Sequence, residues 1–153
     1  AAMQLATGLD FLSLADGVPM NVVGFSGGVY GSNRADRIIG SAGPDSLNGG
    51  GGDDLLEGRG GSDQLDGGSG NDVLRGEEGD DRLFGGESFG VDYLQGGPGN
   101  DYLEGELGND IYAFAAGDGQ DRIKAIVPGK AQLRYFHSRG VFCLLGRIHQ
   151  IKA

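Results

Sequence analysis

The chain has 153 residues, of which 33 are glycine and only 4 are proline, and its formal net charge is −10. This length suits one modest domain, and glycines that do not recur at every third position exclude a collagen helix. The negative charge argues against nucleic acid and anionic membranes as partners and favours cations. The single cysteine, Cys143, excludes an internal disulfide framework. The sequence predicts no membrane span, and it shows no signal-peptide pattern.

Charge divides the chain into segments. All 22 acidic residues lie within residues 1–121, which contain five basic residues, whereas residues 122–153 contain seven basic residues and no acidic one. Such an asymmetry marks segments with different roles. We therefore expect a lead-in over residues 1–30, a repeat domain over residues 31–124 and a basic tail over residues 125–153.

The lead-in is expected to act as an N-terminal cap or as the end of a preceding domain. It contains a short β-prone run at residues 22–23. Residues 24–28, GFSGG, fit the G-x-S-x-G nucleophile elbow of α/β-hydrolases, which requires a helix after the serine and His and acid partners in a sheet. The repeats that follow leave no room for these elements, so we interpret residues 24–28 as a glycine loop.

From Gly31 the chain reads as ten units of about nine residues, best formed as GGGGDDLLE, GRGGSDQLD, GGSGNDVLR and GEEGDDRLF from Gly49 onward. A fixed period of this kind indicates a solenoid or a similar array. The sixth position is always aspartate: Asp36, Asp45, Asp54, Asp63, Asp72, Asp81, Asp92, Asp101, Asp110 and Asp121. The eighth position is always apolar: Ile38, Leu47, Leu56, Leu65, Leu74, Leu83, Leu94, Leu103, Tyr112 and Ile123. Ser88 and Phe89 form a two-residue insertion, and Phe114 and Ala115 interrupt the array before the last unit.

The pattern of one unit predicts a glycine-rich turn followed by a very short strand with one side chain pointing inward. A single unit buries almost nothing, but stacked units can form two parallel sheets with apolar side chains between them and aspartates along each edge. A row of aspartates repels itself unless a cation lies between its members. Carboxylate and carbonyl oxygens without His or Cys in register favour Ca²⁺.

The ten units resemble the nonapeptide G-G-x-G-x-D-x-U-x of the RTX (repeats-in-toxin) family. The resemblance covers residues 31–124 and implies an all-β fold, a right-handed parallel β-roll in which two nonamers make one turn. It also implies several calcium ions, each between the loops of units n and n+2. One loop would contribute its aspartate with the carbonyls at positions two and four, and the other its aspartate with the carbonyls at positions one and three.

Mapped onto this chain, the resemblance predicts a best site between Asp54 and Asp72, with the carbonyls of Gly50, Gly52, Gly67 and Ser69. The full set of expected ligands is Asp36, Asp45, Gly50, Gly52, Asp54, Gly58, Gly60, Asp63, Gly67, Ser69, Asp72, Gly76, Asp81, Asp92, Gly97, Gly99, Asp101, Asp110 and Asp121. Arg34, which replaces a glycine, should weaken a site at Asp36, and the insertion should weaken the sites on either side of Asp92. Other acidic residues are expected to be solvated surface charge: Asp53, Glu57, Asp66, Asp80 and Glu104.

The resemblance implies a calcium-binding module of a secreted bacterial protein, found outside the cell or on its surface and typical of type I secretion. Because the predicted core is thin, we expect the array to be largely disordered without metal and to fold when calcium binds. We expect no catalysis from this chain, since the zinc-protease motif H-E-x-x-H is absent. Two alternatives stay open: the chain is the C-terminal part of a secreted protease or lipase, or a segment of an adhesin, with a catalytic or adhesive domain upstream.

The tail, residues 125–153, contains neither the repeat nor any acidic residue. Residues 141–145 read as a short strand, Cys143 as a packed thiol, and His137 and His149 as ordinary histidines rather than metal ligands. The tail is interpreted as a cap, as part of a secretion signal or as a segment unrelated to the family.

Overall fold

The computed structural model describes residues 11–13, 21–24, 26–124, 132–136 and 151–152, and these residues form strands and no helix. The described part of the chain accordingly contains no apolar helix of membrane-spanning length. The strands are β1 (Phe11–Ser13), β2 (Asn21–Val23), β3 (Gly28–Tyr30), β4 (Arg37–Ile39), β5 (Ser46–Gly51), β6 (Leu55–Gly60), β7 (Gln64–Ser69), β8 (Val73–Glu78), β9 (Arg82–Phe84), β10 (Tyr93–Gln95), β11 (Tyr102–Glu104), β12 (Ile111–Ala115), β13 (Gln120–Lys124), β14 (Gln132–Phe136) and β15 (Ile151–Lys152).

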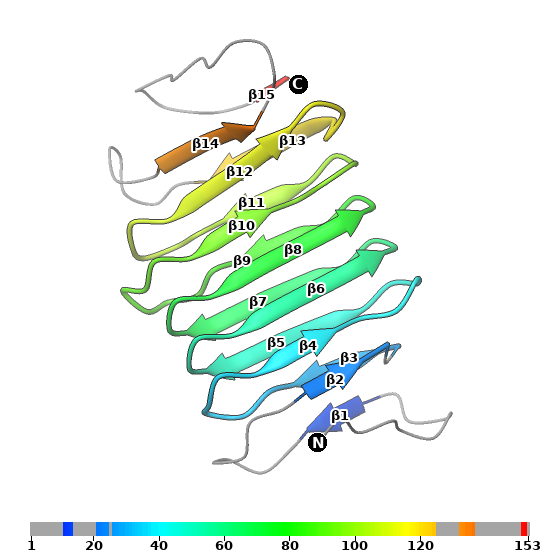
Figure 1. The fold of residues 1–153 in the computed structure, drawn as a ribbon, viewed down its shortest axis with the longest axis vertical. Coiled ribbons are helices and arrows are strands. Elements are labelled where there is room, and N and C mark those ends of the chain that lie inside the picture. The colour runs from blue at the N-terminus through cyan, green and yellow to red at the C-terminus, as the bar shows by residue number, and fades with distance from the viewer. Residues whose placement is uncertain (1–10, 14–20, 25, 125–131, 137–150, 153) are drawn as a thin grey trace.

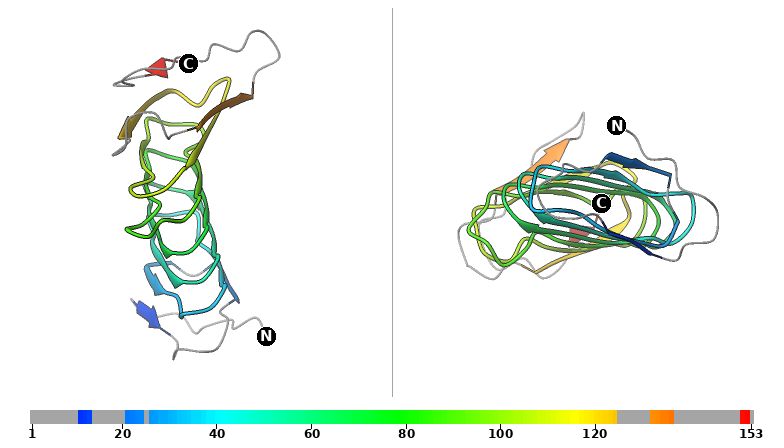
Figure 2. Two further views of the ribbon diagram at one scale, coloured as in Figure 1. Left: turned by 90° about the vertical axis from the view of Figure 1, so that its left-hand side faces the viewer. Right: turned by 90° about the horizontal axis from the view of Figure 1, so that it is seen from below.

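Successive strands alternate between two sheets. One sheet has the order β1-β3-β5-β7-β9-β11-β13-β15 and the other the order β14-β12-β10-β8-β6-β4-β2. The pairs are parallel from β1 to β14, and the chain therefore winds as a solenoid of about five turns (Figure 1). Seen along the stack, each turn is a flattened ring with two narrow edges (Figure 2). The predicted all-β parallel roll is confirmed, whereas the count of ten units stays a prediction.

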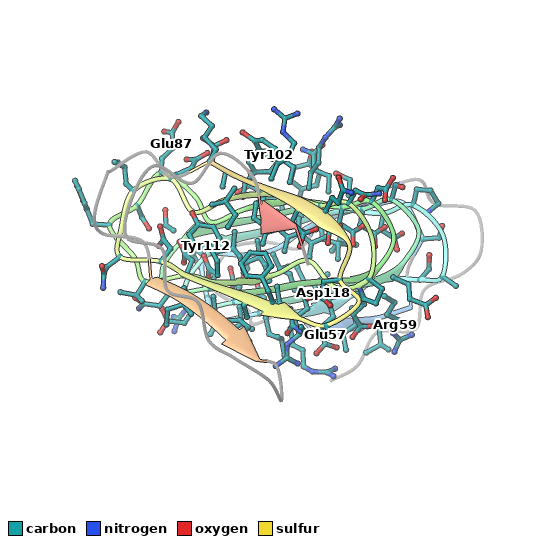
Figure 3. All side chains as sticks on the ribbon, turned by 90° about the horizontal axis from the view of Figure 1, so that it is seen from above. Glu57, Arg59, Glu87, Tyr102, Tyr112 and Asp118 are labelled. Carbon is teal, nitrogen blue, oxygen red and sulfur yellow. The ribbon has the colours of Figure 1, made fainter. Side chains whose placement is uncertain are left out.

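A single column of apolar side chains from each sheet fills the roll. Leu47, Leu65 and Leu83 are register partners in one sheet, and Leu56 and Leu74 in the other. All ten eighth-position side chains are at most 7% exposed. Tyr112 points into the ring, whereas Glu57 and Arg59 lie outside it (Figure 3). Because successive side chains of a strand point to opposite faces, the polar-apolar-polar pattern of each unit places its middle residue in the core, as predicted.

The strands are longest where the repeat is most regular. β5, β6, β7 and β8 each have six residues because the first positions of the next unit also pair, for example Gly50 with Gly68 and Gly60 with Glu78. Elsewhere in the array most strands have three residues. Loops two units apart thus lie directly on one another in the middle of the roll, where the sequence predicts the best calcium site.

Close stacking of the loops explains the glycine at the fourth position. Gly70 and Gly79 have φ angles of +140° and +143°, in the left-handed region that favours glycine. A Cβ atom at either position would overlap the carbonyl oxygen of Gly52 or Gly61 in the loop below. Neighbouring loops can therefore approach to backbone contact only with glycine at this position.

Several predictions concern residues outside the described ranges. These are the strand at residues 141–145, the roles of His137, Cys143 and His149, and most of the lead-in. Within the lead-in, β2 coincides with the β-prone run at residues 22–23. The strand β3 follows Ser26, where a nucleophile elbow needs a helix.

Candidate metal sites in the loops

The sixth-position aspartates lie where loops meet strands. Asp54 directly precedes β6 and Asp63 directly precedes β7. Because β6 and β7 belong to opposite sheets, successive aspartates fall on opposite edges of the flattened ring (Figure 2). All ten are between 1% and 5% exposed. Burial of this degree is rare for aspartate without a compensating partner.

In eight of the ten aspartates, one carboxylate oxygen, Oδ1, holds the loops in register. It accepts a hydrogen bond from the backbone N–H of the aspartate two units earlier, as in the bond from Asp54 to Asp72. The eight donor–acceptor pairs are Asp36–Asp54 (2.7 Å), Asp45–Asp63 (2.8 Å), Asp54–Asp72 (2.8 Å), Asp63–Asp81 (2.8 Å), Asp72–Asp92 (2.9 Å), Asp81–Asp101 (2.8 Å), Asp92–Asp110 (3.2 Å) and Asp101–Asp121 (3.0 Å). The structure therefore brings together the aspartates of units n and n+2, as the sequence predicts.

The other carboxylate oxygen, Oδ2, has no hydrogen-bond partner in six of these aspartates although it is buried. The six are Asp54, Asp63, Asp72, Asp81, Asp92 and Asp101. A buried charged oxygen without a partner is costly. Six such atoms on two edges form a repeated arrangement that calls for a positively charged neighbour.

The surroundings of Oδ2 have room for a small ion and a second oxygen ligand. In the loop of Asp54, a Cβ atom added at Gly49 would overlap Asp54 Oδ2 and lie 2.6 Å from the carbonyl oxygen of Gly67. The same relation recurs for Asp63, where the Cβ would be added at Gly58 and would lie 2.9 Å from the Gly76 carbonyl. The glycine at the first position therefore leaves a small cradle between a carboxylate oxygen and a carbonyl oxygen, two hard ligands of the kind that Ca²⁺ prefers.

Electrostatics also favour a cation in these cradles. The pKa of Asp54 is raised to about 7, chiefly by burial and in smaller part by the neighbouring charges of Asp72 and Asp36. The pKa of Asp92 is raised to about 7 and that of Asp101 to about 8, again chiefly by burial. Burial likewise raises the pKa values of Asp63, Asp72 and Asp121 to about 6, and it also raises those of Asp81 and Asp110. The folded array thus disfavours the carboxylate charge, and a bound cation would restore it.

The predicted carbonyl ligands fall into two groups. Those at the first position, Gly58, Gly67 and Gly76, lie beside an aspartate Oδ2 of the loop below. The others lie where one loop stacks on the next: Gly50, Gly52, Gly60, Ser69, Gly97 and Gly99. The Ser69 carbonyl accepts the Gly52 N–H at 2.8 Å, and a carbonyl keeps a second lone pair for a metal.

In the first two units the aspartate Oδ2 has hydrogen-bond donors, a difference that the sequence analysis missed. Ser32 donates its N–H to Asp36 Oδ2 at 2.6 Å, and Ser41 donates its N–H to Asp45 Oδ2 at 2.6 Å. The Ser41 hydroxyl also lies 3.0 Å from Asp45 Oδ2. The signal was present in the sequence, because serine stands at the second position only in these two units.

The Ser88–Phe89 insertion does not interrupt the ladder. The Asp72–Asp92 and Asp92–Asp110 bonds bridge the unit that contains it. Phe89 is 86% exposed and bulges outward, whereas Ser88 is half-buried and its Oγ accepts the Gly70 N–H at 3.2 Å. In other loops a position-three carbonyl accepts this N–H, as Glu78 does from Gly61. Weaker calcium binding beside Asp92 stays a prediction.

The other acidic residues differ in exposure: Glu57 and Asp66 are half-buried rather than fully solvated. Asp53 and Asp80 are exposed, and each accepts a backbone N–H from an asparagine, Asn71 or Asn100, one turn further on. This second ladder gives the fifth-position asparagines a structural role.

Glu104 corrects a prediction, because it is only 6% exposed rather than solvated. Its carboxylate accepts the Tyr102 hydroxyl at 2.7 Å and pairs with Lys124 at 2.6 Å. The ion pair and the hydroxyl offset the burial of its charge.

Within the described residues, no group of three or more His, Cys, Asp or Glu side chains comes close enough to bind a metal alone. A metal in the cradles would therefore depend on backbone carbonyls as well as on the aspartates. Such a donor set is built entirely of oxygen, fits Ca²⁺ and does not fit zinc or copper.

Comparison with protein families supports this chemistry. The family model described as the RTX calcium-binding nonapeptide repeat (4 copies) matches residues 30–65, 57–89 and 88–123. Together these matches span more than half of the chain and include all the aspartates of the two ladders. A search of curated proteins found no match.

Proposed function

Because this chain belongs to the RTX calcium-binding nonapeptide repeat family, we propose that residues 31–124 form the calcium-binding module of a secreted bacterial protein. The module folds when calcium binds to it outside the cell. Residues 1–30 act as its lead-in and residues 125–153 as its tail. The chain itself serves as a structural module without a catalytic role, and any enzymatic or adhesive activity belongs to an attached domain.

The observation that carries this proposal is the set of six buried Oδ2 atoms without a hydrogen-bond partner. Each belongs to an aspartate whose Oδ1 already accepts the backbone N–H of the aspartate two units earlier. A calcium ion beside Oδ2 would neutralise the carboxylate and bind a carbonyl of the stacked loop at once. The ion would therefore join two turns of the roll, as the backbone hydrogen bonds do.

The thinness of the core explains why folding should depend on the ion. Each unit contributes one inward side chain, worth about 1.5–3 kcal/mol on burial, whereas each ordered residue loses roughly 1–2 kcal/mol of backbone entropy. Ions that bind only the folded state stabilise it by mass action. Extracellular calcium modules bind in the range of about 10⁻⁴–10⁻³ M, so the chain would stay unfolded in a low-calcium cytosol and fold after export.

The test is far-ultraviolet circular dichroism of the full chain, first in EGTA and then in millimolar Ca²⁺ or Mg²⁺. We expect the strand signal to be weak in EGTA, to rise with Ca²⁺ and to stay low with Mg²⁺, which requires near-octahedral geometry and gives up its water reluctantly. A strand signal that is unchanged by EGTA, or that Mg²⁺ restores equally well, would contradict the proposal.

A further inference from the structure

The first two units of the aspartate ladders differ from the six that follow. In six units from Gly49 onward, the aspartate Oδ2 is buried and has no hydrogen-bond donor. In the first two units the same oxygen has donors within the protein. Ser32 provides its N–H at 2.6 Å and its hydroxyl at 3.0 Å to Asp36, and Ser41 provides its N–H at 2.6 Å and its hydroxyl at 3.0 Å to Asp45.

The backbone of the second position differs in the same way. From the third unit on, every residue at this position has a left-handed φ: Gly50 (+94°), Arg59 (+81°), Gly68 (+96°), Glu77 (+72°), Gly86 (+124°), Gly97 (+103°), Glu106 (+60°) and Gly117 (+97°). Ser32 and Ser41 are not among the residues with positive φ. A left-handed φ is unfavourable for arginine and glutamate, so its recurrence there is a property of the loop and not of glycine alone.

The change in φ redirects one N–H. In the fifth and sixth units the second-position N–H groups, those of Gly68 and Glu77, donate to the carbonyls of Gly85 and Gly96 in the loops above. With serine and a negative φ, the same N–H turns to the aspartate of its own unit. The hydroxyls of Ser32 and Ser41 also accept the N–H of Arg34 and Gly43, which fixes the serine in place.

We propose that Ser32 and Ser41 take the position of the cation in the first two units, so that the loops of these units are stabilised by hydrogen bonds from serine and bind no calcium. This inference rests on the proposed function, because it assumes that calcium binds beside the unpartnered Oδ2 atoms. Calcium binding then begins at Asp54 on one edge and at Asp63 on the other. Serine at the second position is the residue that decides whether a loop takes an ion.

The proposal makes a quantitative statement about the number of ions. The two ladders contain eight pairs of aspartates two units apart. If every pair held an ion, the chain would bind eight ions. If serine replaces the ion at Asp36 and at Asp45, six sites remain, one at each aspartate with an unpartnered Oδ2. Native mass spectrometry of the calcium-saturated full chain, checked by equilibrium dialysis, measures this number. Binding of more than six ions by the unaltered chain would overturn the inference.

The decisive variant is Ser32→Gly with Ser41→Gly, which gives the first two units the residue of the third. We expect it to bind two more calcium ions than the unaltered chain at saturation. Each single variant should bind one more, which keeps the test open if the double variant does not fold. Ser62→Gly is the matched control, because Ser62 lies at an exposed fifth position and should leave the number unchanged.

The outcomes separate the two proposals. An unaltered chain that binds no calcium would overturn the proposed function. An unaltered chain that binds calcium while the folded serine variants bind the same number of ions would overturn only the inference drawn from Ser32 and Ser41.

Discussion

The backbone N–H of Asp54 donates to Oδ1 of Asp72 at 2.8 Å, while Oδ2 of both residues is buried without a hydrogen-bond partner. One oxygen of each carboxylate thus maintains the register of the roll, and we propose that the other binds calcium. The two functions can be separated by substitutions that change one oxygen and keep the other.

Asp54→Asn is such a substitution. Asparagine keeps an oxygen that can accept the Asp36 N–H, but it places an NH₂ group where Oδ2 faces the Gly67 carbonyl. We expect calcium affinity at this site to fall by at least about 10–100-fold, the scale seen when even a supporting group of a metal site is lost. The calcium midpoint of folding, followed by circular dichroism, should rise.

Asp53→Asn is the matched control. It removes the same charge from the adjacent residue, which is exposed and keeps an acceptor for the Asn71 N–H. Equal shifts of the calcium midpoint in the two variants would show that general charge, and not the Oδ2 cradle, governs binding.

The raised pKa values predict how the metal-free chain responds to pH. For Asp54, Asp92 and Asp101 the folded-state pKa lies at about 7 to 8, above the ordinary value of 3.8. The folded state therefore binds protons more tightly than the unfolded state, so stability falls as pH rises from about 4 to 8 and is regained on acidification. In calcium-free buffer we expect the strand signal to increase between pH 8 and pH 5. A signal that is constant or decreases over this range would contradict the assignment.

The column of leucines should dominate the stability of the calcium-bound roll. Leu74 is fully buried between Leu56 and Leu94, so Leu74→Ala should lower the free energy of unfolding by about 2–5 kcal/mol. Its neighbour Val73 points to the outer face of the same strand and is half-buried. Val73→Ala should therefore have a much smaller effect. Urea denaturation at saturating calcium measures both, and similar losses would place the core elsewhere.

Adjacent glycines provide a test of loop stacking. Gly61 has a φ of +116°, and a Cβ atom there would lie 2.6 Å from the Gly43 carbonyl carbon. Gly60 has no positive φ, and the nearest atom to an added Cβ is 3.8 Å away. Gly61→Ala should therefore destabilise by more than about 1–2 kcal/mol, the penalty of a left-handed φ alone.

Gly60→Ala should instead be neutral or stabilising by up to about 1 kcal/mol, because alanine restricts the unfolded chain. The two variants differ by one position in the same loop, and urea denaturation at saturating calcium compares them directly. A larger loss for Gly60→Ala than for Gly61→Ala would contradict the stacking geometry described above.

The period of the sequence was enough to predict the roll and its two aspartate ladders, because position six and position eight keep their residue types throughout. The burial of Asp54 and Leu74 follows directly from that pattern. The state of each carboxylate oxygen could not be predicted in the same way, because it depends on the direction of one N–H at the second position. A serine such as Ser32 looks like any small polar loop residue until its φ is known.

The burial of Glu104 could not be predicted from its unit, because it depends on a contact between two turns of the roll. Glu104 occupies the ninth position of its unit, where charged residues of other units, such as Arg75 and Lys124, are exposed. Its environment comes from Lys124, which is twenty residues away in the chain but is its register partner in the next turn.

The bulge at Phe89 shows which contacts keep neighbouring turns of the roll in register. Leu94 pairs with Leu74, and Asp92 with Asp72, across a separation of twenty residues, where neighbouring turns use eighteen. The register between turns is thus kept by strand pairing and by the aspartate carboxylates, and the loop at this corner can differ in length. Peptide segments inserted at residues 88–89 should be displayed outward without shifting the turns, which makes this corner a natural attachment point for tags, labels or short binding epitopes.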